Sequence, residues 1–160
     1  MSFEIISVIG MGYIGLPTAA MFAATKIKVI GVDINPDVVD IINRGDIHIV
    51  EPDLDMIVHA AVTEGYLRAV VIPEPADAFL IAVPTPFKSS DDEYRKPDLS
   101  YVMGAVESIA PVLKKGNLVV LESTSPVGAT EDVARLLADL RPDLTFPQDV
   151  GSDADVNIAH

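Results

Sequence analysis

Short apolar runs alternate along the chain with longer segments in which apolar and polar residues recur at helical spacing. The short runs are rich in Val and Ile, which is typical of strands buried on both faces of a sheet. Alternation of strand and helix favours an α/β fold with a mostly parallel sheet. The expected strands are 5–9, 28–32, 68–72, 78–83, 118–121 and 156–159.

Residues that start or stop helices delimit the segments between these strands. Asn35 followed by Pro36 is a typical helix start, and Gly45 stands where that helix should end. Residues 73–77 leave room for no more than one turn of helix, and the polar, proline-containing stretch 84–97 predicts a loop. The expected helices are 13–25, 36–44, 52–65, 98–113 and 130–140.

The order of these elements predicts the fold class. Six strands joined by five crossovers are the content of a Rossmann-type, doubly wound domain with a mostly parallel six-stranded sheet. The 160 residues are enough for one domain with a substantial core and leave little room for a second. We therefore expect a single Rossmann domain over residues 1–160.

Charge and composition exclude several classes of protein. The net charge is −13 and no basic patch occurs, so nucleic acid is not an expected partner. No apolar stretch approaches the roughly 20 residues that span a bilayer, and the N-terminus lacks a signal-peptide pattern. We therefore expect no membrane contact and a cytoplasmic location. The absence of cysteine excludes a cysteine nucleophile within this chain, and three scattered histidines predict no metal site.

The first expected strand runs directly into a glycine-rich turn, Gly10-Met11-Gly12-Tyr13-Ile14-Gly15. Between a strand and a helix, this G-x-G-x-x-G pattern is typical of dinucleotide binding. Gly10 permits the tight turn, Gly12 lets the backbone approach a pyrophosphate, and Gly15 lets the helix pack closely on the strand. In so acidic a chain, we expect backbone N–H groups and the helix dipole to hold the phosphates.

The second expected strand ends on Asp33, at the distance from the glycine turn where such domains place an acidic residue. A carboxylate there can accept hydrogen bonds from the ribose hydroxyls of an adenosine, and it repels a 2′-phosphate. No Lys or Arg lies in residues 34–37 to hold that phosphate. The pattern therefore predicts NAD rather than NADP as the cofactor. The alternative is that Asp33 only caps a turn.

Further motifs stand at the carboxyl ends of the expected strands, where ligands bind an open α/β sheet. The fourth strand leads into Val83-Pro84-Thr85-Pro86, and the fifth leads into Ser123-Thr124-Ser125-Pro126-Val127-Gly128. With residues 8–17 and 51–54, they resemble the UDP-glucose/GDP-mannose dehydrogenase family over essentially the whole chain. Residues 43–54 and 122–128 are most similar to the branch of that family that oxidises UDP-N-acetyl-D-mannosamine.

The resemblance implies an NAD-dependent oxidoreductase of polysaccharide biosynthesis. It would oxidise the C6 alcohol of a UDP-sugar to the uronate, with UDP-N-acetyl-D-mannosamine as the expected substrate. It also implies that this chain is the NAD-binding part alone, because the family's catalytic cysteine and lysine belong to later segments. The fragment should then be inactive by itself, the nucleotide sugar should bind through the rest of the parent protein, and that parent is expected to be a homo-oligomer.

The resemblance also assigns roles to residues. Tyr13 and Ile14 would offer backbone amides to the pyrophosphate, while Thr85 and Thr130 would line the cofactor. Thr124 matches a threonine that helps to position water near the reacting carbon, although capping of a turn explains the same hydroxyl. The expected cofactor-binding residues are Gly10, Gly12, Tyr13, Ile14, Gly15, Asp33, Thr85 and Thr130, with Thr124 in a supporting catalytic role.

Two other functions stay open at this point. One is another NAD-dependent dehydrogenase of the 3-hydroxyacyl or 6-phosphogluconate type, which should lack the run 123–130 and the Glu-Pro pair at 51–52. The other is a non-enzymatic Rossmann module that senses NAD. A chain of this length without a nucleophile suits a sensor, but a sensor has no evident need for residues 123–128.

Overall fold

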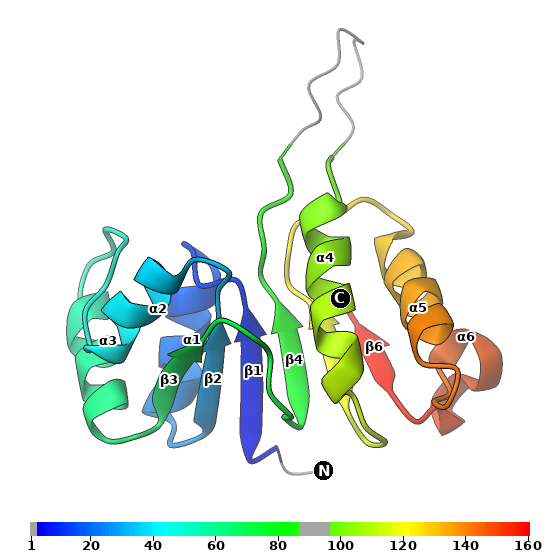
Figure 1. Cartoon of the computed structure of the whole chain (residues 1–160), viewed down its shortest axis with the longest axis horizontal. Coiled ribbons are helices and arrows are strands. Elements are labelled where there is room, and N and C mark those ends of the chain that lie inside the picture. Colours follow the sequence, from blue (N-terminus) through cyan, green and yellow to red (C-terminus); the bar gives the residue numbers. More distant parts are fainter. Residues whose placement is uncertain (1–2, 87–96) are drawn as a thin grey trace, which may run out of the picture.

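The computed structural model describes residues 3–86 and 97–160, which form one sheet with helices on both faces (Figure 1). The strands are β1 (Ile5–Ile9), β2 (Lys28–Val32), β3 (Leu67–Val70), β4 (Ala78–Ile81), β5 (Leu118–Leu121) and β6 (Asn157–Ala159). All pairings are parallel, and the order in the sheet is β3-β2-β1-β4-β5-β6. This is the order of a doubly wound Rossmann sheet, so the predicted fold class is confirmed.

Helices follow the strands and cover the two faces. The α-helices are α1 (Gly15–Ala24), α2 (Pro36–Asn43), α3 (Leu54–Thr63), α4 (Ser100–Ile109), α5 (Ala129–Leu140) and α6 (Pro147–Val150); the 3-10 helices are η1 (Ala110–Val112) and η2 (Gly151–Asp153). None of the helices in residues 3–86 and 97–160 has the length and apolar character needed to cross a bilayer.

Alternate residues of each strand point into two separate cores, because successive side chains of a strand lie on opposite faces. Ala78 and Leu80 of β4 pack in the core that also contains the buried residues of α1, α2 and α3. Phe79 and Ile81 pack in the other core, with α4 and α5. The sheet is therefore buried on both faces. The ends of its strands are left to contact ligands.

The connection from β3 to β4 crosses the sheet without a helix (Figure 1). The buried side chain of Asn117 fixes its end: the amide nitrogen donates to the carbonyls of Ala76 (2.9 Å) and Asp77 (3.2 Å), and the amide oxygen accepts from the Lys114 N–H (2.8 Å). The Asp77 carboxylate in turn accepts the N–H of Ile5 and of Glu4. These two bonds hold the pKa of the Asp77 carboxyl below its usual range, and nearby Lys114 adds to the effect.

A side chain covers part of the open edge of β3. Asn43, the last residue of α2, donates from its amide to the Ala69 carbonyl (2.9 Å) and accepts from the Ala69 N–H (2.7 Å). One side-chain amide thus replaces the neighbouring strand that Ala69 lacks. Because unpaired edge groups invite pairing with another chain, this contact protects the edge as well as joining α2 to the sheet.

Most predicted elements are confirmed, and the differences have local causes. The strands 5–9, 28–32 and 118–121 have the predicted limits. Helix α1 begins at Gly15 rather than residue 13, because the glycine turn occupies the preceding residues. Helix α3 begins at Leu54 rather than residue 52, because Asp53 takes a left-handed conformation with φ +62°.

Three further differences concern the ends of elements and the second half. Strands β3 and β4 each end two residues before their predicted limits, at Val70 and Ile81. Helix α4 changes to the 3-10 turn η1 at Ala110, because Pro111 has no N–H for the next helical bond. The short helices α6 and η2 were not predicted. Of the predicted loop 84–97, residues 87–96 lie outside the described residues.

Replacing Asn117 should test the connection between β3 and β4. We expect Asn117→Ala to lower the free energy of unfolding by about 2–4 kcal/mol, because a buried N–H and two carbonyls lose their partner. Asn117→Asp should cost at least as much at neutral pH, because a carboxylate would then face two carbonyl oxygens. Urea unfolding measures both. Lys115→Ala, which removes the ion pair between the exposed Lys115 and the partly buried Asp155, is the control and should cost under about 1 kcal/mol; an equal loss in Asn117→Ala would contradict the role of Asn117.

Candidate functional site

The candidate residues lie at the carboxyl edge of the sheet, on either side of its switch point. Strands β1 and β4 are neighbours, but β1 leads to α1 on one face and β4 leads to α4 on the other. In open α/β sheets the chains diverge at such a point and leave a crevice where ligands bind. The glycine turn follows β1, Asp33 follows β2, and the threonine-containing segments follow β4 and β5.

Two glycines are required by the turn itself. Gly10 has φ +92°, and its N–H donates to the Val32 carbonyl at 2.8 Å. A Cβ on Gly10 would lie 2.8 Å from the Ala82 carbonyl oxygen, and a Cβ on Gly15 would lie only 1.7 Å from the Gly10 carbonyl oxygen. Because both obstacles are backbone atoms, neither position accepts a side chain while α1 packs this closely on β1.

Gly12 is different, because the fold does not require it. It has no left-handed φ, and nothing lies within 4 Å of the place where its Cβ would be. Tyr13 and Ile14 beside it are exposed. Within residues 3–86 and 97–160, the N–H groups of Gly12, Tyr13 and Ile14 donate no hydrogen bond. The turn therefore presents free donors and open space on its outer side.

The start of α1 suits an anion. The helix has no side-chain cap and no acidic residue in its first turn. Its dipole and its free N–H groups therefore point at the same open space beside Gly12, which is the arrangement that binds phosphate in other proteins. A dinucleotide pyrophosphate fits this donor set.

Met11 anchors the turn and was not predicted to matter. Its side chain is fully buried and lies over Gly31 of β2. A Cβ on Gly31 would lie 2.5 Å from the Met11 Cε, so the glycine in the strand makes room for the methionine. The two residues are far apart in the sequence, and the only sequence signal was a glycine within an otherwise apolar strand.

Asp33 joins β2 to the glycine turn. One carboxylate oxygen accepts the Met11 N–H at 3.1 Å, and the other accepts the Asn35 N–H at 2.9 Å. Asp33 therefore does cap a turn, as the structural alternative expected. Each oxygen of an ionised carboxylate has a second lone pair, so the partly exposed group keeps acceptor capacity for a ligand. Its structural and ligand-binding roles are compatible.

The ends of β4 and β5 are tied together on the other side of the switch point. The Thr85 hydroxyl donates to the Thr124 carbonyl at 2.6 Å. The buried Ser123 hydroxyl donates to the Val83 carbonyl at 2.7 Å. Thr124 is exposed. Thr130 is the second residue of α5, and among the described residues no hydrogen bond joins it to Thr85 or Thr124. The structure thus joins Thr85 to Thr124 by a hydrogen bond and shows no such bond for Thr130 among the described residues.

Two side-chain contacts at this edge were missed by the sequence analysis. The Thr18 hydroxyl of α1 donates to Glu122 Oε1 at 2.8 Å, and Ser125 Oγ lies 3.1 Å from His160 Nε2. Glu122 is the first residue after β5 and His160 is the first after β6. Their position directly after expected strands was the available signal, since the carboxyl ends of parallel strands meet at one edge.

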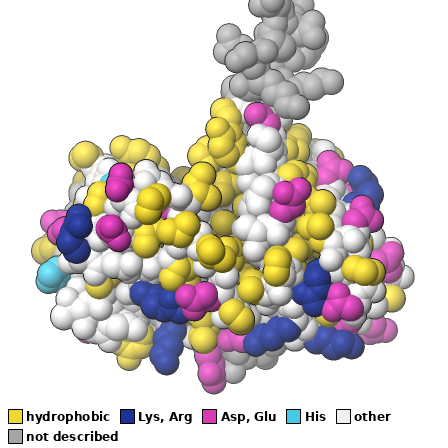
Figure 2. Space-filling view, viewed as in Figure 1, with side chains coloured by type: hydrophobic (Ala, Val, Ile, Leu, Met, Phe, Trp, Pro, Cys, Tyr) yellow, Lys and Arg dark blue, Asp and Glu magenta, His cyan; other side chains and the backbone are white. Residues whose placement is uncertain are grey.

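Basic side chains are occupied by carboxylates. Every described Lys and Arg except Lys28 has a carboxylate oxygen within 4.0 Å, as in the pairs Lys114–Asp77 and Lys115–Asp155. Figure 2 shows basic side chains beside acidic ones along the lower part of the face in view. In the described part of the chain, the donors left for phosphate at the carboxyl edge are therefore backbone N–H groups and neutral side chains, with no unpaired cation among them.

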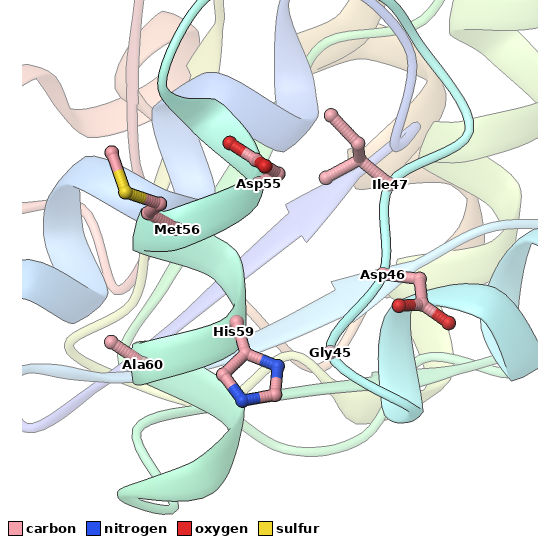
Figure 3. Close-up of a pocket in the computed structure, with 7 residues that line it drawn as sticks. All are labelled: Gly45, Asp46, Ile47, Asp55, Met56, His59 and Ala60. Atoms are coloured by element: carbon pink, nitrogen blue, oxygen red, sulfur yellow. The ribbon is translucent and has the colours of Figure 1, made fainter.

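Away from the candidate residues, a hollow of about 610 Å³ lies between the turn after α2 and the outer face of α3 (Figure 3). The His59 ring covers Gly45, whose Cβ would lie 2.9 Å from His59 Nδ1, and Asp46 pairs with Arg44. No group of three or more potential metal ligands converges among the described residues. None of the predicted site residues lines this hollow, which is lined by Gly45, Asp46, Ile47, Asp55, Met56, His59 and Ala60.

Comparison with known proteins agrees with this geometry. Residues 4–160 match the NAD binding domain of the UDP-glucose/GDP-mannose dehydrogenase family. The chain is 66% identical over 160 residues to the UDP-N-acetyl-D-mannosamine dehydrogenase of Yersinia pestis, covering 100% of this chain. It is 62% identical over 158 residues, 99% of this chain, to the NDP-N-acetyl-D-galactosaminuronic acid dehydrogenase of Ralstonia nicotianae.

A solved structure is also similar. The UDP-N-acetyl-mannosamine dehydrogenase of Staphylococcus aureus matches 96% of this chain with a TM-score of 0.85 and 39% sequence identity. This chain covers 37% of the Yersinia protein, 36% of the Ralstonia protein and 35% of the Staphylococcus chain. The 160 residues therefore span about a third of the length of the relatives they match.

Alanine at two glycines of the turn should separate folding from cofactor binding. We expect Gly12→Ala to change the free energy of unfolding by less than about 1 kcal/mol and to weaken NAD binding at least about tenfold, because the methyl group enters only the open space. Gly15→Ala should lower the free energy of unfolding by about 3 kcal/mol or more, because its Cβ meets backbone. Urea unfolding and calorimetric titration measure the two effects; full NAD affinity in Gly12→Ala would show that the cofactor does not approach this side of the turn.

Proposed function

Because the chain belongs to the UDP-glucose/GDP-mannose dehydrogenase family, as its NAD binding domain, we propose that it holds NAD for the oxidation of a nucleotide sugar. The observation that carries the proposal is the carboxyl edge of β1 and β2, where a turn with free N–H groups lies beside the Asp33 carboxylate. NAD, when bound, supplies a hydride acceptor. The residues of this chain bind and orient it.

Asp33 accepts the hydroxyls of the adenosine ribose in this proposal. Its two oxygens are held by the N–H groups of Met11 and Asn35, so the carboxylate is fixed before a ligand arrives. The same charge disfavours a 2′-phosphate, and residues 34–37 contain no Lys or Arg to offset it. NAD is therefore preferred over NADP.

The pyrophosphate lies over Gly12 and accepts from the N–H groups of Tyr13 and Ile14. Gly10 and Gly15 contribute indirectly, because they let α1 begin directly at the end of β1. Binding at a helix start needs no cationic side chain, which suits a chain with a net charge of −13.

The residues at the ends of β4 and β5 would hold the nicotinamide half. Thr85 lines it there, with its hydroxyl fixed on the Thr124 carbonyl. Thr130, near the start of α5, is a further contact from the same edge. Among the described residues the Thr124 hydroxyl has no hydrogen-bond partner, and its supporting role in the proposed reaction is to hold water near the reacting carbon.

The reaction proposed for the complete protein is the oxidation of the C6 alcohol of a UDP-sugar to a carboxylate. This change removes four electrons as two hydrides and adds one oxygen atom from water. Covalent capture of the aldehyde stage needs a nucleophile such as a thiolate, and this chain contains no cysteine. We therefore place the nucleophile, and most contacts to the sugar, in the remainder of the protein.

The names of the relatives support a choice of sugar for the proposal. UDP-N-acetyl-D-mannosamine is named in the Yersinia relative at 66% identity and is the proposed substrate. At 62% identity the Ralstonia relative is named for a galactosaminuronic acid instead, so this domain alone does not fix the sugar. The homo-oligomeric state and the cytoplasmic location stay predictions.

Of the two alternative functions, one is disfavoured by the family match and the other is separated from the proposal only by activity. A hydroxyacyl or phosphogluconate dehydrogenase is disfavoured, because the family match extends over residues 4–160, including the run 123–130. A module that only senses NAD shares the whole cofactor site and differs in catalysis, so activity of the complete protein separates it from the proposed enzyme.

Replacing Asp33 should weaken cofactor binding and relax the choice of cofactor. We expect Asp33→Ala to weaken NAD binding by about 1–3 kcal/mol, because the ribose loses its acceptors. It should also lower stability, because the N–H groups of Met11 and Asn35 lose their partner. Asn35→Ala removes the α2 cap on Asp37 and should lower stability by about 1 kcal/mol without changing NAD affinity. Calorimetric titration with NAD and NADP checks both variants; unchanged NAD affinity in Asp33→Ala would remove Asp33 from the site.

Turnover should require the complete gene product. We expect the 160-residue chain to bind NAD but to form no NADH from UDP-N-acetyl-D-mannosamine, because the proposal places most contacts to the sugar outside this chain. The complete protein should form two NADH for each sugar oxidised. The absorbance of NADH at saturating NAD measures turnover in both cases. UDP-glucose and GDP-mannose are tested as alternative substrates. Binding of NAD by the complete protein without oxidation of any nucleotide sugar would favour the sensor.

A further inference from the structure

Glu122 places an unassigned carboxylate at the crevice. It is the first residue after β5, it is exposed, and its Oε1 accepts the Thr18 hydroxyl at 2.8 Å. Its N–H donates to the Ile81 carbonyl of β4 at 2.9 Å. The side-chain bond therefore joins α1, which carries the phosphate-binding turn, to the β4–β5 half of the site. It spans the switch point of the sheet.

The charge of Glu122 is not neutralised by a basic side chain in the described part of the chain. All the ion pairs there use other carboxylates. Lys28, the one described cation without such a pair, begins β2 and therefore stands at the opposite, amino edge of the sheet. Among the described residues, therefore, no cation competes with a ligand for the Glu122 carboxylate.

The two redox forms of the cofactor differ in charge at the nicotinamide ring. The oxidised nicotinamide ring is cationic and the reduced ring is neutral, while the pyrophosphate is the same in both. With the adenosine end at Asp33, a dinucleotide that spans the crevice carries its nicotinamide over the β4–β6 half. Repulsion between Glu122 and the pyrophosphate then cancels when the two forms are compared, and attraction to the cationic ring remains.

We propose that Glu122, held in place by Thr18, is a specificity-determining carboxylate that makes this site prefer NAD⁺ over NADH. The inference rests on the proposed function. An oxidation that removes four electrons takes up NAD⁺ twice, and NADH must leave between the two hydride transfers. A fixed charge that favours the oxidised form speeds this exchange.

The quotient of the dissociation constants, Kd for NADH divided by Kd for NAD⁺, tests the proposal without any turnover. Calorimetric titration of the purified chain with each form gives both constants. Glu122→Gln keeps an amide oxygen to accept the Thr18 hydroxyl and removes only the charge. We expect it to lower the quotient by about two- to tenfold. The difference from the unaltered chain should shrink as salt is added, because the interaction is electrostatic.

Two control variants separate local charge from other effects. Asp139→Asn removes an equal charge from an exposed position near the far end of α5 and should leave the quotient within about twofold. Thr18→Val keeps the charge of Glu122 but removes its anchor, and should lower the quotient less than Glu122→Gln does. Both variants carry the complete cofactor-binding turn.

Three results would overturn the inference, and they are distinguishable. An unchanged quotient in Glu122→Gln, or an equal fall in Asp139→Asn, would sink the role of Glu122 while NAD binding itself stood. Failure of the unaltered chain to bind either form would overturn the proposed cofactor site and this inference with it.

Discussion

The close approach of α1 to the end of β1 is the contact on which the site depends. A Cβ on Gly15 would lie 1.7 Å from the Gly10 carbonyl oxygen, so the helix starts where no side chain fits. This places the first N–H groups of the helix at the carboxyl edge and leaves those of Tyr13 and Ile14 free in the described structure. The same turn delivers the Met11 N–H to Asp33, so the anion-binding and carboxylate parts are set by one backbone path.

The net charge of −13 repels an anionic cofactor less than its size suggests. Exposed charges separated by more than about 8–10 Å are largely screened at physiological salt, whereas a phosphate at a helix start contacts its donors directly. The described cations, Lys28 excepted, are already paired with carboxylates. In the proposed site, short-range backbone donors would therefore contribute more to phosphate binding than net charge does.

How much the sequence predicts depends on how local the determining contacts are. The strands 5–9, 28–32 and 118–121 were predictable with their limits, because a strand buried on both faces is one continuous apolar run. The glycine turn and Asp33 were predictable because their spacing is fixed by a short piece of backbone. The pairs Met11–Gly31 and Thr18–Glu122 were not, since only the packed sheet shows which distant residues meet. Helix α6 has no buried residue and hence no periodic pattern to reveal it.

The two halves of the cofactor site are built in different ways. In the half at Gly10–Gly15 and Asp33, backbone contacts fix the ligand-binding atoms before any ligand is present. In the half at β4 and β5, backbone carbonyls fix Thr85 and Ser123, but the side chains of Thr124 and Glu122 stay exposed. In the proposed function, the first half would hold the part of the cofactor that never reacts, so rigidity there would improve binding without a chemical demand. The second half would have to leave room for a substrate that other parts of the protein also contact, and exposed polar side chains on a fixed backbone would meet that requirement.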